Sequence, residues 1–187
     1  MNGPWEKELG WLAAKGARLA PGLSDGGLRA AEEACGASFP PDLASLLRAA
    51  LPLGDRFPDW RSPGSAEIKK MLAWPFEGLC FDIEHNAYWP KEWGARPPAL
   101  EDAFKAARQK VEAAPKLIPL YSHRYLPAAP REAGNPVFSV YQTDVIYYGR
   151  DLRSYLACEF GDRPWEAATS GSLKRIPFWT DLVESNR

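Results

Sequence analysis

The sequence lacks the segments on which several classes of protein depend. No stretch approaches the ~18 consecutive apolar residues of a membrane-spanning helix, so we expect no membrane contact. The first residues lack a basic stretch followed by an apolar one, so we expect no secretory signal. Only three cysteines occur, Cys35, Cys80 and Cys158, and none belongs to a CxxC pair. We therefore expect free thiols in a cytoplasmic protein rather than a disulfide framework or a zinc ribbon.

An excess of charge of either sign is also missing. The 187 residues include 23 basic and 24 acidic side chains, interleaved along the chain, for a net charge of −1. Nucleic-acid-binding proteins usually carry a basic excess or a clustered basic face, so we expect no direct binding of nucleic acid. Inhibitors of nucleases tend to be acidic, because charge steers them to their partners, and this chain is not acidic as a whole.

Motifs for nucleotide binding and for nucleophilic catalysis are absent. The chain has no GxGxxG, no GxxxxGK[ST] and no GxSxG. Its two histidines, His85 and His123, belong to no HxH or HExxH pattern. A catalytic zinc site needs three protein ligands with supporting partners. We therefore expect neither a metal site nor a cofactor.

One enzymatic alternative stays open. Asp82 and Glu84 would share one face of a predicted strand, just before His85, and paired carboxylates can transfer protons. A hydrolase could use His85 or His123 with one of these acids. Adjacency in sequence does not by itself orient the Ser122 hydroxyl toward the His123 ring, and such carboxylates more often form a solvated surface. We expect no catalytic residues.

The chain does contain a series of short elements separated by prolines and glycines. Apolar spacing and capping residues predict helices over residues 5–19, 24–35, 40–51, 65–73, 100–114 and 151–160, and in the later part of 173–185. Alternating apolar residues predict strands over residues 79–84, 117–121, 136–141 and 143–148. The last two strands are joined by one residue and must be antiparallel. We therefore predict an α+β fold with a mostly antiparallel or mixed central sheet flanked by helices.

Aromatic and basic side chains gather in two places outside these elements. One is the irregular, proline-containing segment of residues 85–98, and the other precedes the loop of residues 127–135. Trp, Tyr and Arg dominate the residues that contribute most to protein–protein binding. The alternative is that these rings cover the edge of the core under a long loop. The candidates for contact with a partner are Tyr88, Trp89, Trp93, Arg96, His123, Arg124 and Tyr125.

Three blocks of sequence stand out by their order. Glu32 precedes Pro41-Asp42-Leu43 and Leu46-Leu47, and Leu117-Ile118-Pro119-Leu120 follows much later. Residues 134–140, 144–149 and 152–160 then form a third block. In order and spacing, these blocks resemble the opening block, an internal strand and the closing strand–strand–helix unit of the SUKH superfamily, which groups Smi/Knr-type cell-wall regulators with many bacterial proteins.

The resemblance implies a protein-binding fold without enzymatic activity. It implies one SUKH-like domain over residues 1–187, with a core over 24–160 and additions at 5–19 and 173–187. Bacterial members are often immunity proteins that neutralise a partner toxin, and other members are regulatory scaffolds. We therefore expect another protein, a toxin, as the partner, with a regulatory or scaffold role as the alternative. No catalytic or cofactor-binding residues come with the family.

Overall fold

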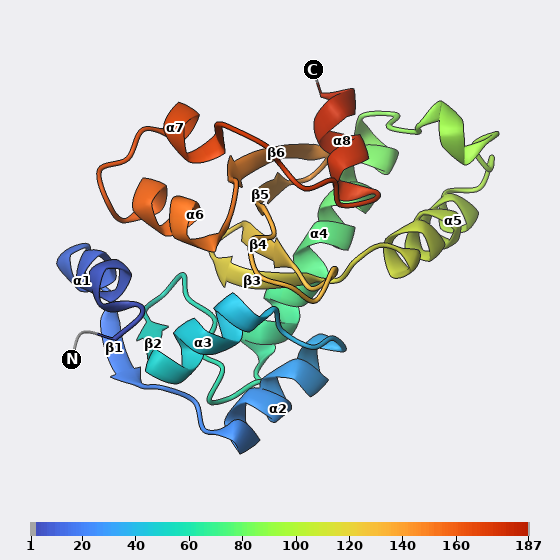
Figure 1. The fold of residues 1–187 in the computed structure, drawn as a ribbon. Coiled ribbons are helices and arrows are strands. Elements are labelled where there is room, and N and C mark those ends of the chain that lie inside the picture. Colours follow the sequence, from blue (N-terminus) through green and yellow to red (C-terminus); the bar gives the residue numbers. More distant parts are fainter. Residues whose placement is uncertain (1–2, 187) are drawn as a thin grey trace.

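Eight α-helices and two antiparallel sheets make up residues 3–186, the part of the chain that the computed structural model describes (Figure 1). One sheet has two strands and the other has four. The predicted α+β fold is therefore confirmed. In this part of the chain, every helix is too short or too polar to cross a membrane.

The helices and strands alternate irregularly along the chain. The helices are α1 (Glu6–Ala14), α2 (Asp25–Cys35), α3 (Pro41–Ala49), α4 (Ala66–His85), α5 (Leu100–Ala113), α6 (Leu152–Glu159), α7 (Trp165–Thr169) and α8 (Trp179–Ser185), with a 3-10 turn η1 (Lys91–Trp93). The strands are β1 (Arg18–Pro21), β2 (Ala50–Leu53), β3 (Leu117–Tyr121), β4 (Arg124–Pro127), β5 (Val137–Tyr141) and β6 (Asp144–Gly149).

The four-stranded sheet lies at the centre of the molecule and has the strand order β3-β4-β5-β6 (Figure 1). Helix α4 contacts strands β3 and β5, and α5 packs on α4 and projects to the side. Helices α2 and α3 and the small sheet, in which β1 pairs with β2, lie together at one end. Helices α6, α7 and α8 contact β6.

Helix ends that carry capping residues lie where the sequence predicts them. The Ser24 hydroxyl accepts the Gly27 N–H at 3.1 Å before α2, and Gly36 ends that helix with a φ of 66°. This left-handed conformation suits glycine, which has no side chain to clash. The Asp151 carboxylate accepts the Ser154 N–H at 2.6 Å at the start of α6. These local signals therefore mark where both helices begin and where α2 ends.

Several short elements differ from the prediction. The first helix ends at Ala14 rather than continuing to residue 19, because Gly16 turns the chain with a φ of 90° into β1. Strands β1, β2 and β4, each of four residues, and the five-residue helix α7 were not expected. Elements of this length carry too few residues for a periodic pattern.

The largest correction concerns α4. The sequence predicts a helix over residues 65–73 and a strand over 79–84, whereas the structure has one helix of 20 residues that includes Pro75. A proline cannot donate to the carbonyl four residues earlier, which is that of Met71. The Tyr125 hydroxyl donates to this oxygen at 2.8 Å from β4. The helix therefore continues past its proline with the help of a residue 54 positions away.

Replacing Tyr125 with Phe should lower the free energy of unfolding by about 1.5 kcal/mol, because the Met71 carbonyl loses its donor while the core keeps its ring. Urea unfolding followed by circular dichroism measures this change. Tyr141→Phe is the matched control, since the Tyr141 side chain is 53% exposed. Equal stability of the two variants would show that Tyr125 does not support α4.

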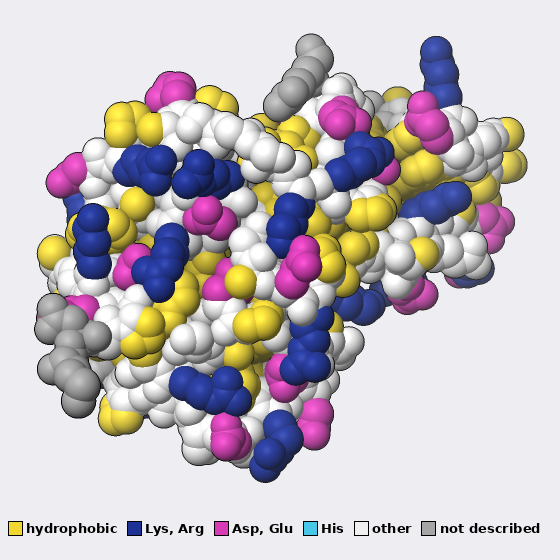
Figure 2. All heavy atoms as spheres, viewed as in Figure 1, with side chains coloured by type: hydrophobic (Ala, Val, Ile, Leu, Met, Phe, Trp, Pro, Cys, Tyr) yellow, Lys and Arg dark blue, Asp and Glu magenta, His cyan; other side chains and the backbone are white. Residues whose placement is uncertain are grey.

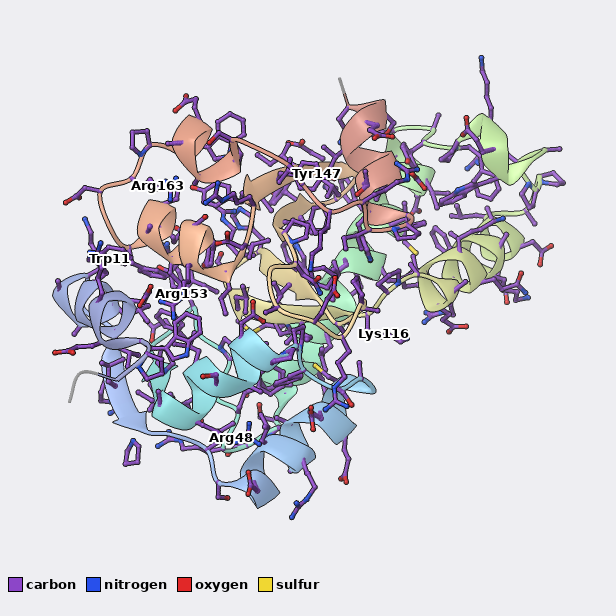
Figure 3. All side chains as sticks on the ribbon, viewed as in Figure 1. Trp11, Arg48, Lys116, Tyr147, Arg153 and Arg163 are labelled. Carbon is purple, nitrogen blue, oxygen red and sulfur yellow. The ribbon has the colours of Figure 1, made fainter. Side chains whose placement is uncertain are left out.

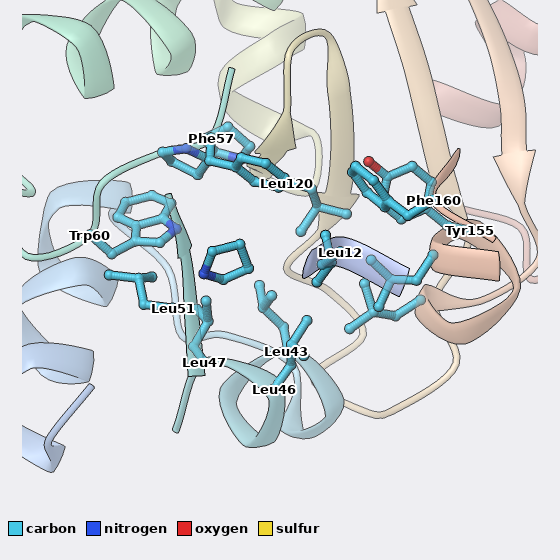
Figure 4. Close-up of a pocket in the computed structure, with 15 residues that line it drawn as sticks. Leu12, Leu43, Leu46, Leu47, Leu51, Phe57, Trp60, Leu120, Tyr155 and Phe160 are labelled. Carbon is cyan, nitrogen blue, oxygen red and sulfur yellow. The ribbon is translucent and has the colours of Figure 1, made fainter. Parts of the chain in front are cut away.

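The largest group of buried side chains lies between α1, α3, β3 and α6 (Figure 4). Leucines from α1 and α3 meet the rings of Trp60, Tyr155 and Phe160 there. The cavity that they leave is only about 30 Å³, and apolar side chains line most of it. Such a cavity holds about one water molecule, so it is a feature of core packing and not a ligand site.

Tryptophan is frequent, with eight residues, and four of their indole groups donate to a distant segment of the chain. A buried indole ring contributes apolar area, and its N–H usually finds an acceptor. The five indole donors are Trp5 to Ser45 Oγ at 2.9 Å, Trp74 to Val140 O at 3.1 Å, Trp89 to Gly94 O at 2.9 Å, Trp165 to Tyr147 O at 3.1 Å and Trp179 to Pro115 O at 2.7 Å.

Candidate functional site

The aromatic segment that follows α4 packs largely against the protein itself. The Trp93 ring lies 5.2 Å from Trp89 and 6.1 Å from Phe178, measured between ring centroids. Tyr88 meets Trp93 edge-on at 6.2 Å, and burial raises the pKa of Tyr88 to about 12. These half-buried rings cover the cluster of buried side chains between α4 and α5. This packing is the one expected if the rings cover the edge of the core.

Arg96, from the same segment, completes the end of α4. Its guanidinium donates to the Ile83 carbonyl at 3.0 Å. The last carbonyls of a helix have no partner within the helix, and cations are favoured at that end. Arg96 therefore already has a structural role.

The second predicted set lies at the hairpin between β3 and β4. Arg124 forms an ion pair with Glu159 of α6 at 3.0 Å, and its guanidinium lies 3.7 Å from the centroid of the Tyr148 ring. Tyr125 is 1% exposed and so offers no surface to a partner. His123 is half-buried, and burial together with the nearby guanidinium groups lowers its pKa. Arg124 and Tyr125 therefore fasten the hairpin to α6 and α4.

The carboxylates of the enzymatic alternative do not share a face. Residues 79–84 are helical, and positions two apart on a helix point in different directions. Asp82 is buried and accepts the Thr143 N–H at 2.8 Å and the Thr143 hydroxyl at 2.6 Å, whereas Glu84 is exposed. The predicted pair of acids on one strand face is therefore wrong, and Asp82 instead holds the turn between β5 and β6 against α4.

The two histidines occupy different environments. His85 ends α4, exposed, whereas His123 lies in the β3–β4 turn with the Tyr141 ring 6.1 Å away. The Ser122 hydroxyl lies 3.2 Å from His123 Nδ1, closer than sequence adjacency led us to expect. Ser122 has a φ of 51°, and this turn geometry brings the two side chains together.

A groove of about 600 Å³ lies between α4 and α5 and ends at the C-terminus of α2 and residues 115–117. In Figure 2 the surface is concave where the part that contains α5 joins the rest of the molecule. Figure 3 shows Lys116 at this junction. Binding sites of proteins commonly enclose about 300–1,000 Å³. The groove is therefore large enough to hold part of a partner.

One stripe of α4 borders this groove. Helical spacing places Glu77, Phe81 and Glu84 at positions i, i+4 and i+7 of the same stripe, and all three line the groove. Phe81 is a large apolar side chain that is 44% exposed. The His85 ring stacks on it, with centroids 4.3 Å apart and planes inclined by 18°. The stripe thus presents an aromatic surface between two carboxylates.

The opposite rim comes from α5 and the residues after it. Arg108 lies over the Phe76 ring at 4.0 Å, and Glu112 and Lys116 continue the rim. Among the described residues, no carboxylate forms an ion pair with Arg108 or Lys116. Within residues 3–186, the glutamates of the groove have one partner at ion-pair distance, which is His85 at 4.0 Å from Glu84. Most charges of the groove are therefore available to a ligand.

Cys80 lies in the groove, half-buried, and all three cysteines are free. Burial raises the pKa of the Cys80 thiol and of the Cys158 thiol above the ordinary 9.0, and raises the pKa of Cys35 to about 12. Within residues 3–186, no group of three or more His, Cys, Asp or Glu side chains is placed to hold a metal ion. A thiol that acts as a nucleophile at neutral pH needs a lowered pKa, so the raised pKa of Cys80 does not favour that role.

The raised pKa of Cys80 predicts slow alkylation by iodoacetamide at pH 7.5, with a rate that still rises between pH 8.5 and 9.5. Only the thiolate reacts, and a raised pKa keeps the thiolate fraction low until the pH is high. Mass spectrometry of the three cysteine peptides measures the rates, with urea-unfolded protein as the control. A folded-state rate at pH 7.5 above that of the unfolded protein would instead indicate an activated nucleophile.

Comparisons with known proteins assign no family to this chain. No family model, no curated protein and no solved structure matches it.

Proposed function

We propose that this chain is a non-catalytic protein-binding domain of the immunity type, which neutralises a partner toxin by forming a complex with it. The observation that carries the proposal is the groove between α4 and α5. It places the exposed Phe81 ring between the carboxylates of Glu77 and Glu84 on a regular helix. Aromatic side chains at the centre of a concave surface are typical of the residues that contribute most to protein binding.

The sequence blocks that resemble the SUKH superfamily support the proposal. The first block forms α2 and α3, and Glu32 Oε1 accepts the Phe39 N–H at 2.7 Å between them. The second block forms β3, and the third forms the consecutive elements β5, β6 and α6. Helix–helix, strand and strand–strand–helix units thus follow one another in the order that the resemblance implies.

The distribution of charge supports a basic partner. The chain as a whole has a net charge of −1, which gives little long-range steering. Among residues 3–186, in contrast, Glu77 and Glu84 of the α4 rim have no lysine or arginine partner, and the cations Arg108 and Lys116 lie on the opposite rim. Toxins that act on nucleic acid are expected to carry a basic surface, and a local acidic rim is sufficient to orient such a partner.

Co-expression tests this proposal with the polypeptide that is encoded next to this chain. We expect that polypeptide to arrest growth, and we expect this chain to restore growth and to elute with it as one complex in gel filtration. Phe81→Ala should weaken both effects, whereas the matched control Tyr141→Ala should not, since Tyr141 is exposed but lies outside the groove. A neighbour that binds without being toxic would favour the regulatory or scaffold role. A neighbour that neither binds nor arrests growth would contradict the proposal.

A further inference from the structure

The groove lies along two packed helices, α4 and α5, and a third helix could pack between them. Phe76 of α4 meets Arg108 of α5, and Leu79 and Ile83 meet Ala103 and Ala107, so the two helices run antiparallel. The small alanines allow the helices to approach closely along one side. On the open side, the groove is lined by the apolar side chains of Phe76, Phe104 and Val111.

The groove does not suit an extended strand. Its long walls are helices, whose backbone N–H and C=O groups are already paired within each helix. An added strand needs free backbone donors and acceptors along an edge, whereas a helix needs only an apolar groove for its apolar face. The walls of this groove therefore favour a helical occupant.

The carboxylates of the α4 wall specify what the occupant carries on the side that faces this wall. Glu77 and Glu84 are one heptad apart, which separates them by about 10 Å along α4. Phe81 lies between them on the same stripe. A helix that complements this stripe carries two basic side chains one heptad apart, with an apolar side chain between them.

We propose that the groove binds an amphipathic helix of the partner, with Lys or Arg at positions i and i+7 and a large apolar residue between them. The inference rests on the proposed function and names the segment that the partner presents. Lys116 lies at the end of the groove away from Glu84, after the end of α5. A cation there favours the C-terminus of the bound helix, so this helix runs parallel to α5.

Synthetic peptides test the inference. One peptide of about 18 residues, long enough to form a helix, carries Arg at i and i+7 around a Leu, and a second carries Glu in place of both Arg residues. Fluorescence anisotropy should show that the basic peptide binds the full chain about tenfold more tightly than the acidic one at low salt. Phe81→Ala should weaken binding of the basic peptide about tenfold.

A charge-reversal variant makes the test specific. The double variant Glu77→Lys/Glu84→Lys should prefer the acidic peptide. The matched control is Glu67→Lys/Glu101→Lys, which changes the charge equally at exposed positions outside the groove. Circular dichroism checks that every variant is folded. No binding of the basic peptide at millimolar concentration, or equal preferences of the groove and control variants, would overturn the inference.

Three further outcomes bear on this inference and on the proposed function. If the neighbouring polypeptide binds the wild type and the variant Glu77→Lys/Glu84→Lys equally well, the proposed function stands and the groove is not the site. If the wild type alone is a dimer in gel filtration and this variant is a monomer, the groove holds a second copy of the chain, and the inference is wrong. If the control variant still binds the neighbouring polypeptide and the groove variant does not, the inference is supported.

Discussion

Asp82→Ala should lower the free energy of unfolding by about 4 kcal/mol, because it removes a buried carboxylate that accepts several hydrogen bonds. The carboxylate accepts the Thr143 N–H at 2.8 Å, the Thr143 hydroxyl at 2.6 Å and the Asn86 amide at 2.6 Å. Asp82 is 4% exposed, so its carboxylate depends on these bonds rather than on water. The variant removes the shared acceptor of three donors at the contact between α4 and the β5–β6 turn.

The geometry of this contact leaves little room for adjustment. A Cβ atom on Gly78 would lie 2.8 Å from Gln142 Cα, so the turn rests directly on the helix. Urea unfolding measures the effect of Asp82→Ala, with the exposed Glu84→Ala as a control that should change little. In a double-mutant cycle, Asp82→Ala and Thr143→Ala should show a coupling of about 1 kcal/mol or more. A loss below about 1 kcal/mol in the single variant would contradict the account.

Arg153→Met should cost about 3 kcal/mol, because it leaves the buried Glu8 carboxylate without its cation. Arg153 of α6 forms an ion pair with Glu8 of α1, donates to the Pro4 carbonyl at 2.6 Å and lies 4.0 Å over the Trp5 ring. Figure 3 shows Arg153 at the junction of the two helices. Glu8 is 5% exposed, so its charge is poorly hydrated once the guanidinium is gone.

Two variants separate charge from packing at this junction. Glu8→Gln/Arg153→Met should recover part of the loss, because a neutral amide is cheaper to bury than an unpaired carboxylate. Lys15→Met removes a cation from an exposed pair with Asp162 and should leave unfolding unchanged. If Arg153→Met and Lys15→Met unfold at the same urea concentration, the Glu8–Arg153 pair does not hold α1 in place.

Local patterns were sufficient where the signal lies within one element. Ser24, Gly36 and Asp151 mark helix ends by their own chemistry, and the structure confirms them. Pro75 shows the opposite case, since a proline normally interrupts a helix and the hydroxyl that compensates for it belongs to Tyr125 in β4. The strand predicted over residues 79–84 was therefore wrong for a reason that lies in tertiary contact.

The same error hid the candidate site. As a strand, residues 79–84 place Phe81 beside Ile83 on a buried face; as a helix, they leave Phe81 44% exposed and bury Ile83. Glu77, Phe81 and Glu84 share one stripe only if residues 77–84 are helical, and the sequence predicts a strand over 79–84. The sequence predicts Tyr88, Trp93 and Arg96 as interface residues because their types are common at interfaces. In the structure, the two rings cover the cluster between α4 and α5, and the Arg96 guanidinium caps the end of α4.

The most direct test of the groove as the binding surface is a thiol footprint of the complex with the neighbouring polypeptide. Cys80 lies in the groove, whereas Cys158 is similarly half-buried, has a pKa raised by the same cause and lies outside it. We predict that complex formation slows the alkylation of Cys80 at pH 9 and leaves the rate of Cys158 unchanged. An unchanged rate at Cys80 in a saturated complex would contradict the assignment of the groove.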